Sequence, residues 1–378
     1  MNRKITRTIS SFIFFLFTLL SLISCSSGSE KKVPSFLEKD PELVVANLIW
    51  SNRINAVDFP LQISSSDNAV TLVDSSGNAI QINTENGIGN WKFKLNTPIS
   101  AGLGGNGIEF AAVSKSNKLI VFHKDKIIWQ RPLPADSYTP PLVAGGRVFV
   151  LTANREVVAF DGKTGAYLWK QERPGDSLVL KQSGVLLAVG NTLVVGLGGS
   201  LVGLNPDTGL TNWDVKVANS RGINDVERLV DLIGPVSRNK NIVCVRAYQT
   251  AVACVDAFRG RLLWSKSSVG EVGITGDEEV IFSVESDGKL TALKQGNGER
   301  LWYVDSLKYR DLSSPILLGR SVAVGDGFGF FHLLSRKDGS LMGRLKSDNS
   351  AIINSPVLVG KTLVLSTAKG GIFGYRPQ

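Results

Sequence analysis

Short apolar runs recur along the whole chain and are separated by polar turn residues. Valine, leucine and threonine dominate these runs, and glycine, asparagine or aspartate stands at their borders, as in 146–153 (GRVFVLTA), 191–198 (NTLVVGLG) and 361–368 (KTLVLSTA). Runs of this length and composition are typical of β-strands. The pattern predicts an all-β protein built from many short strands.

The tryptophans give these strands a period near 40 residues. Their successive separations are 41, 38, 40, 44, 51 and 38 residues, and the seven are Trp50, Trp91, Trp129, Trp169, Trp213, Trp264 and Trp302. An eighth copy of the repeat keeps its glycine, Gly339, but has Gly343 where the tryptophan would stand. Four short strands with their turns fill such a period, which is typical of a propeller blade. Eight four-stranded blades are predicted.

A phrase similar to segment 159–169 (AFDGKTGAYLW) recurs along the chain, and its residues explain the repetition. Asp161 and Thr164 can hydrogen-bond to the backbone of the turn, and Gly165 can take the positive φ that reverses the chain. Trp169 then falls on the outer strand of its blade, where a large ring can wedge against the neighbouring blade. All seven tryptophans are predicted to dock blades in this way, and no cofactor is needed to account for the repeat.

The two ends of the chain are predicted to complete one blade. Trp50 lies in 43–54 (LVVANLIWSNRI) without three strands before it, whereas three strands near the C-terminus have no outer strand after Tyr375. The N-terminal strand should therefore join the last three strands and close the ring without an open seam. This places the propeller at residues 44–378.

Residues 1–24 have the pattern of a secretory signal. Three basic residues precede an apolar run that is too short to span a membrane comfortably, and the run ends in LISC, which resembles the lipobox of bacterial lipoproteins. The resemblance implies a lipidated Cys25. Because Ser26 and not aspartate follows, it also implies an anchor at the periplasmic face of the outer membrane. Residues 25–43, which are rich in serine, proline and charge, are predicted to be a flexible tether.

Charge and motif content exclude several classes of function. The formal charge of +9 falls to +6 without the leader, and the basic residues are scattered, which argues against nucleic-acid binding. The chain has two histidines and no HExxH, CxxC or P-loop pattern, so no metal site or nucleotide chemistry is expected. The glycine-rich 325–330 (GDGFGF) is predicted to be a tight hairpin. Cys244 and Cys254 flank a predicted turn, and both a disulfide and two buried thiols remain open alternatives.

Lipobox, short polar tether and a single propeller of Trp-docking repeats together resemble the BamB family, lipoproteins of the outer-membrane β-barrel assembly machinery. The resemblance covers nearly the whole mature chain. It implies a non-catalytic scaffold that binds the POTRA domains of BamA and assists insertion of outer-membrane proteins, and direct contact with unfolded barrel strands is a further implication. Quinone-dependent dehydrogenases share the repeat, so such an enzyme is the alternative. These enzymes usually add long loops, a calcium site and adjacent cysteines, and none of these features is evident in this sequence. A propeller lipoprotein that serves another envelope partner is a third interpretation.

Two connections between blades are the candidate partner site. The longest interval between tryptophans exceeds the shortest by 51 − 38 = 13 residues, around 218–235, and the preceding connection contains 176–184. Both run from an outer strand to the next inner strand and should emerge as neighbours on one face. The residues alone leave open whether the leucines of 176–184 form an apolar patch or begin a strand. The resemblance assigns BamA binding to Leu178, Leu180, Lys181, Arg228, Leu229 and Asp231.

Two positions of this stretch depart from the family pattern. Lys181 stands in place of a forked arginine and keeps only its charge. Ile233 stands at a second acidic position, so Asp231 is the stronger candidate of the two.

Overall fold

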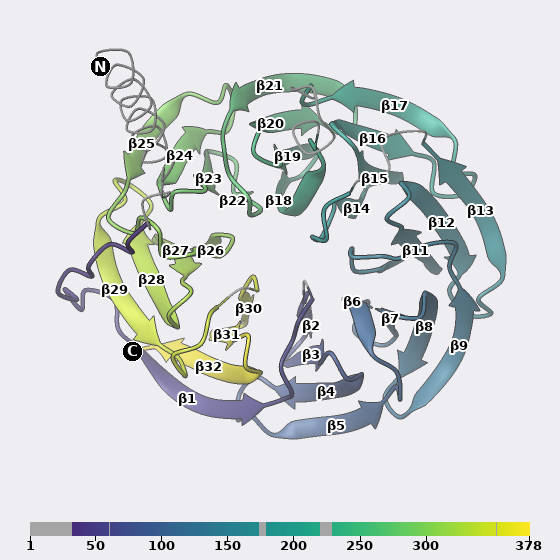
Figure 1. Cartoon of the computed structure of the whole chain (residues 1–378), viewed down its shortest axis with the longest axis horizontal. Helices are drawn as coiled ribbons and strands as arrows, with labels where there is room; N and C mark the ends of the chain where they lie inside the picture. Colours follow the sequence, from purple (N-terminus) through teal and green to yellow (C-terminus); the bar gives the residue numbers. More distant parts are fainter. Residues whose placement is uncertain (1–31, 60, 174–178, 220–228, 353) are drawn as a thin grey trace, which may run out of the picture. The chain divides into compact units, whose positions relative to one another are not determined.

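The fold is a closed ring of eight four-stranded antiparallel sheets (Figure 1). The computed structural model describes residues 32–378 except 60, 174–178, 220–228 and 353, and the compact unit that contains the ring is Pro34–Gln378. Every sheet runs from an inner strand to an outer strand in chain order, apart from the blade that holds both ends of the chain. The predicted eight-bladed propeller is therefore confirmed.

The first four blades contain β2 (Ser64–Ser66), β3 (Ala69–Val73), β4 (Asn78–Asn83) and β5 (Gly89–Lys94); β6 (Ile99–Gly105), β7 (Phe110–Ser114), β8 (Lys118–His123) and β9 (Lys126–Pro132); β10 (Leu142–Ala144), β11 (Arg147–Leu151), β12 (Glu156–Asp161) and β13 (Tyr167–Glu172); β14 (Leu186–Val189), β15 (Thr192–Leu197), β16 (Ser200–Leu204) and β17 (Thr211–Lys216). The next three contain β18 (Leu232–Asn239), β19 (Ile242–Ala247), β20 (Ala251–Asp256) and β21 (Arg261–Ser267); β22 (Thr275–Gly276), β23 (Val280–Val284), β24 (Leu290–Lys294) and β25 (Arg300–Val304); β26 (Ile316–Leu318), β27 (Ser321–Gly325), β28 (Phe330–Ser335) and β29 (Leu341–Lys346). The last blade contains β30 (Val357–Val359), β31 (Thr362–Ser366), β32 (Gly371–Pro377) and β1 (Ala46–Arg53).

The two chain ends close the ring as predicted. Strand β1 pairs antiparallel with β32 along its whole length, from Ala46 opposite Pro377 to Arg53 opposite Gly371. Because this pair is formed by opposite ends of the chain, the last blade has no hairpin between its third and outer strands. The ring is therefore closed by backbone hydrogen bonds between segments that are far apart in sequence.

Each tryptophan lies against the blade that follows its own. The indole N–H of Trp129 donates to the carbonyl of Gly162 at 2.7 Å, and Gly165 in the same turn has a φ of +66°. A Cβ atom on Gly165 would lie 2.5 Å from Trp129 Cδ2, so the absence of a side chain at this position leaves room for the indole of Trp129. The same contact with the next blade's turn glycine recurs at Trp50, Trp169, Trp213, Trp264 and Trp302, whereas Trp91 packs on Phe110.

All eight outer strands carry a β-bulge at the same place. In β13, Ala159 faces Trp169 and Phe160 faces Tyr167, so that Leu168 is the extra residue. The corresponding extra residue precedes the tryptophan in six other outer strands and precedes Gly343 in β29. A bulge twists the strand and interrupts the ladder of hydrogen bonds that its free edge could offer.

The N-terminal segment explains the missing eighth tryptophan. A Cβ atom on Gly343 would lie 2.3 Å from the carbonyl oxygen of Val44, and the Val44 N–H donates to the Met342 carbonyl at 2.9 Å. The outer strand β29 faces the one blade without a docking hairpin, so a tryptophan there would have no turn to dock on. The backbone before β1 occupies that place.

A buried ion-pair network lies where residues 35–38 meet the seventh blade. Asp326 is fully buried and accepts bonds from Arg310 Nη2 at 2.7 Å and His332 Nε2 at 3.0 Å. Burial alone would raise the pKa of Asp326, but the bonds from His332 and the Phe330 N–H hold it below its usual value. Arg310 Nη1 also donates to the carbonyl of Ser35 at 3.0 Å.

His332 is held neutral inside this network. Its Nδ1 accepts a bond from Arg344 Nε at 3.2 Å, and Arg344 Nη1 donates to the carbonyl of Glu38 at 3.2 Å. Burial lowers the pKa of His332, and the nearby guanidinium groups act in the same direction against the attraction of Asp326. The glycine-rich 325–330 supplies Asp326 and forms the predicted hairpin between β27 and β28.

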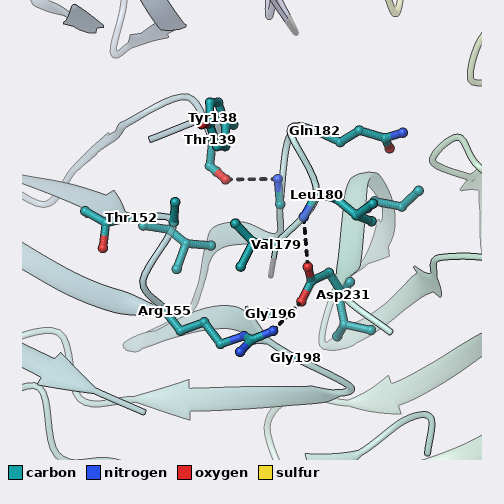
Figure 2. A pocket seen from close by; sticks show the side chains of 15 residues that line it. Tyr138, Thr139, Thr152, Arg155, Val179, Leu180, Gln182, Gly196, Gly198 and Asp231 are labelled. Atoms are coloured by element: carbon teal, nitrogen blue, oxygen red, sulfur yellow. Dashed lines mark hydrogen bonds and ion pairs between the residues drawn. The ribbon is translucent and has the colours of Figure 1, made fainter. Parts of the chain in front are cut away.

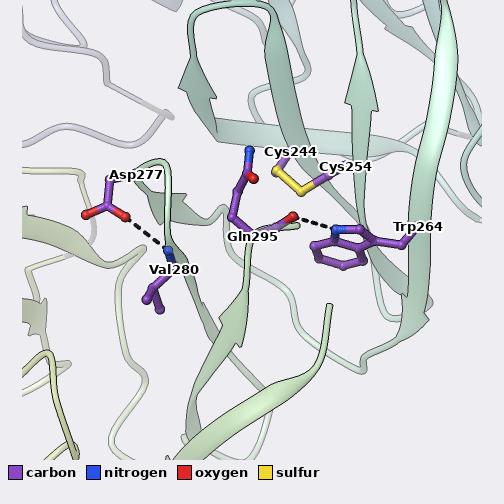
Figure 3. The surroundings of a disulfide bond; sticks show 6 residues. All are labelled: Cys244, Cys254, Trp264, Asp277, Val280 and Gln295. Atoms are coloured by element: carbon purple, nitrogen blue, oxygen red, sulfur yellow. Dashed lines mark hydrogen bonds between the residues drawn. A yellow bond between two sulfur atoms is a disulfide. The ribbon is translucent and has the colours of Figure 1, made fainter. Parts of the chain in front are cut away.

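Cys244 and Cys254 form a disulfide, which the sequence left open (Figure 3). They face each other directly on β19 and β20, and both side chains are buried. Trp264 lies beside the bond and donates its indole N–H to the carbonyl of Gln295 at 2.7 Å, so the disulfide backs one of the docking tryptophans.

Among the described residues, no helix has the length and apolar character that crossing a membrane requires.

Candidate functional site

The connections β13–β14 and β17–β18 lie side by side on one face of the ring. Gly184 and Ile233 form an antiparallel bridge, and the Gly234 N–H donates to the carbonyl of Ser183 at 2.9 Å. Within each antiparallel blade, the turn from the second to the third strand lies on the same face of the propeller as the connections between blades. Both connections therefore lie on that face. The predicted adjacency of the two loops is thus observed, and the turn of the blade before them, between β11 and β12, comes to the same face.

The first connection places Leu180 and Lys181 outside the strands. Strand β14 begins only at Leu186, so Leu180 belongs to the loop and does not begin the inner strand. Leu180 is half-buried, while Lys181 is exposed with its Nζ 6.0 Å from the ring centre of Tyr138. Leu178 lies outside the described residues.

The second connection brings its carboxylate to the first. Asp231 Oδ2 accepts the Leu180 N–H at 3.2 Å, and Oδ1 lies 3.4 Å from Nη2 of Arg155 (Figure 2). The carbonyl of Asp231 accepts the Tyr248 N–H at 3.0 Å, which ties this residue to its own blade. Leu229 is half-buried two residues earlier, and Arg228 lies outside the described residues.

Arg155 is the residue of this site that sequence reasoning missed. It stands in the turn between β11 and β12 with a φ of +61°, and its side chain is only 13% exposed. Arg155 and Asp231 are 76 residues apart and belong to different blades. No local pattern announces such a contact; the only signal is that both lie on the face that the topology assigns to these turns and connections.

Ile233, the second position that departs from the family pattern, is buried and only 1% exposed. It lies in β18, opposite Arg246 on β19, and its backbone makes the bridge to Gly184. A side chain that is this deeply buried cannot contact a partner. The replacement of an acidic residue by isoleucine is therefore compatible with the packing of this blade, and Asp231 remains the only acidic candidate of the pair.

Two cavities adjoin this face. A small one, of about 50 Å³, lies beneath Leu180 and is lined by Arg155, Asp231 and Thr139 among others (Figure 2). A larger one, of about 670 Å³, lies among inner strands and is lined mainly by apolar side chains such as Phe59 and Val185. Within the described part of the chain, no three histidine, cysteine or acidic residues are grouped so that they could hold a metal ion.

Comparison with known proteins decides the family. The family model described as outer membrane protein assembly factor BamB matches residues 75–304. Outer membrane protein assembly factor BamB of Burkholderia pseudomallei is 32% identical, over 95% of this chain and 96% of that protein. BamB of Bordetella pertussis is 30% identical over 95% of both chains. The chain belongs to the BamB family.

Solved structures agree with the BamB-family fold. The crystal structure of BamB from Moraxella catarrhalis superposes with a TM-score of 0.81 at 23% identity, over 88% of this chain and all of that one. The quinohemoprotein alcohol dehydrogenase from Comamonas testosteroni reaches a TM-score of 0.65 at 12% identity, over 88% of this chain and 76% of that one, which is a similarity of fold alone. The BamB family consists of non-catalytic assembly scaffolds, so the dehydrogenase interpretation is set aside.

Proposed function

We propose that this protein is a lipid-anchored scaffold of the outer-membrane β-barrel assembly complex and that the β13–β14 and β17–β18 connections bind the POTRA domains of BamA. Family membership supports a role in assembling outer-membrane proteins. The observation that carries the site is the pairing of the two connections into one surface by the Leu180–Asp231 bond and the Gly184–Ile233 bridge.

The chemistry of this surface suits a folded protein partner. Half-buried leucines, Leu180 and Leu229, lie beside an exposed cation, Lys181, which gives a small apolar area with a charged edge. Leu178 and Arg228, which lie outside the described residues, are proposed to extend the same surface. The apolar residues supply contact area, and the charged ones fix the orientation of the partner.

The anchor is the second part of the proposal. Acylation of Cys25 would hold the protein at the periplasmic face of the outer membrane, and the residues after it would act as a tether that raises the local concentration of the binding surface. Replacement of Cys25 by serine should move the protein from the membrane fraction to the soluble periplasm and abolish labelling by a fatty-acid probe. Unchanged fractionation and labelling of this variant would contradict the anchor.

Calorimetric titration of the soluble mature chain with the POTRA domains of the cognate BamA tests the partner. We expect Leu180→Glu to weaken binding by at least about tenfold, because it places a charge in an apolar contact. Leu210→Glu is the matched control, since Leu210 is 67% exposed and directly precedes β17, at the end of that strand opposite the β17–β18 connection. Equal effects of both changes would contradict the proposed site. Absence of binding by the unmodified chain would contradict the proposed partner and favour another envelope partner.

A further inference from the structure

Three blades contribute to one contact at the centre of the proposed binding surface. Arg155 comes from the β11–β12 turn, Leu180 from the β13–β14 connection and Asp231 from the end of the β17–β18 connection. The Asp231 carboxylate lies between the other two, with one oxygen toward the Leu180 N–H and the other toward the Arg155 guanidinium (Figure 2). The contact therefore fixes the relative position of the two connections.

We infer that Arg155 is a positioning residue for partner binding, and that Asp231 acts through the shape of the β13–β14 connection and not by touching the partner. This inference rests on the proposed function of the surface. It changes the role of the carboxylate from a group that contacts the partner to an internal support of the loop, and it adds to the site a residue from a turn that belongs to neither connection.

The state of the Asp231 side chain supports a brace. It is only 18% exposed, and each of its oxygens already faces a donor within the chain. A partner cation would have to compete with Arg155 for an oxygen that is largely covered. Arg155 is equally enclosed, at 13% exposure, so neither group offers a free charged surface to a protein in solution.

The geometry of the loop supplies the mechanism. The Leu180 N–H is bound to Asp231, and four residues later the Gly184 N–H donates to Oγ1 of Thr139 at 2.9 Å. Between these two bonds the loop presents Lys181, whose cation lies near the ring of Tyr138. Loss of the Arg155–Asp231 pair would release the first of these two attachments, so the leucine side chain would no longer be held in its binding orientation.

The test compares POTRA binding by the unmodified chain, Arg155→Met, Asp231→Asn and the double variant. We expect each single change to raise the dissociation constant by about tenfold, in the range of one charge-assisted hydrogen bond. Because both act on the same brace, the double variant should bind no more weakly than Asp231→Asn alone. Multiplicative losses, or unchanged binding by Arg155→Met, would overturn the inference.

Arg147→Met is the matched control. Arg147 lies at the other end of β11 and also pairs with a carboxylate outside its own blade, that of Asp207, so it has the same chemistry on the opposite face. It should leave POTRA binding unchanged, whereas Arg155→Lys, which keeps the charge, should recover part of the loss. A loss of equal size in Arg147→Met would mean a general effect on the ring and would refute a specific role for Arg155.

Hydrogen exchange at the Leu180 amide separates this inference from the proposed function. Arg155→Met, but not Arg147→Met, should speed exchange of that amide in the free protein. If the unmodified chain fails to bind POTRA domains, the proposed function is refuted while the exchange experiment still decides whether Arg155 braces the loop. Unchanged exchange in Arg155→Met would overturn the inference whatever the partner proves to be.

Discussion

Replacing one docking glycine by alanine should measure how much the tryptophan contact stabilises the ring. Gly165 and Gly146 belong to the same blade and both have positive φ, at +66° and +72°. An added Cβ would meet Trp129 at 2.5 Å at the first position and nothing within 4 Å at the second. The comparison of Gly165→Ala with Gly146→Ala therefore removes the backbone term and leaves the tryptophan contact.

The expected magnitudes follow from this geometry. Left-handed backbone costs an alanine about 1–2 kcal/mol, and this cost falls on both variants. At Gly165 the ring of Trp129 must also shift, which adds about 1–3 kcal/mol of overpacking and weakens its bond to the Gly162 carbonyl. Gly165→Ala should therefore lower the free energy of unfolding by about 2–3 kcal/mol more than Gly146→Ala.

Urea unfolding followed by tryptophan fluorescence provides the measurement, with equal slopes in denaturant required for the comparison. In the Trp129→Leu background, which removes the ring, the two alanine changes should cost the same. Equal midpoints of Gly165→Ala and Gly146→Ala in the unmodified background would refute the docking argument. A difference that persists without the tryptophan ring would refute it as well.

Three further changes test other parts of the ring. Reduction of the disulfide, or joint replacement of Cys244 and Cys254 by alanine, should lower the free energy of unfolding by about 2–3 kcal/mol. This is the value expected for closing a short loop, here with a sequence separation of 10 residues. An unchanged urea midpoint under reductant would contradict this prediction. Gly343→Ala should cost about 1–3 kcal/mol because its Cβ would meet Val44, whereas Gly296→Ala, with open space and no positive φ, should stay within about 0.5 kcal/mol in the same urea assay. Because the pKa of His332 is lowered in the folded chain, the unfolded chain takes up a proton at a higher pH than the folded chain does. The contribution of neutral His332 to the free energy of unfolding should therefore be fully present above about pH 6.5 and be lost as the pH falls below it. Urea midpoints measured from about pH 7.5 to 5.5 should fall less steeply for His332→Gln than for the unmodified chain, and parallel profiles would contradict the assignment.

The fold could be predicted because its signal repeats. Each blade restates the same short strands, turn glycine and tryptophan, so eight weak local patterns reinforce one another. The role of the glycine was only half visible, since its positive φ is a local property whereas its contact with Trp129 joins residues of different blades. The disulfide was undecided for a related reason: a slip of one residue in the β19–β20 register would have placed the two sulfurs on opposite faces.

The candidate site was predictable in place but not in detail. Strand order alone puts the two connections side by side, and this is what the Gly184–Ile233 bridge shows. Arg155 escaped prediction because its contact with Asp231 depends on how three blades are rotated around the ring, which no stretch of sequence records. The family pattern suggested an acidic group near Ile233, and only the structure reveals that this position is buried.

The bulges bear on the expectation that unfolded barrel strands pair with the outer edges of the ring. A client strand laid along β13 would find a regular ladder only over Trp169–Glu172, because Leu168 breaks the register on the other side. The same interruption occurs in every outer strand, and backbone before β1 contacts β29. A propeller edge of this kind favours short, weak pairing over capture of a full barrel strand. The longest interval between tryptophans instead falls at the β17–β18 connection, on one face of the propeller. Specific binding is therefore better sought on that face than along the outer strands.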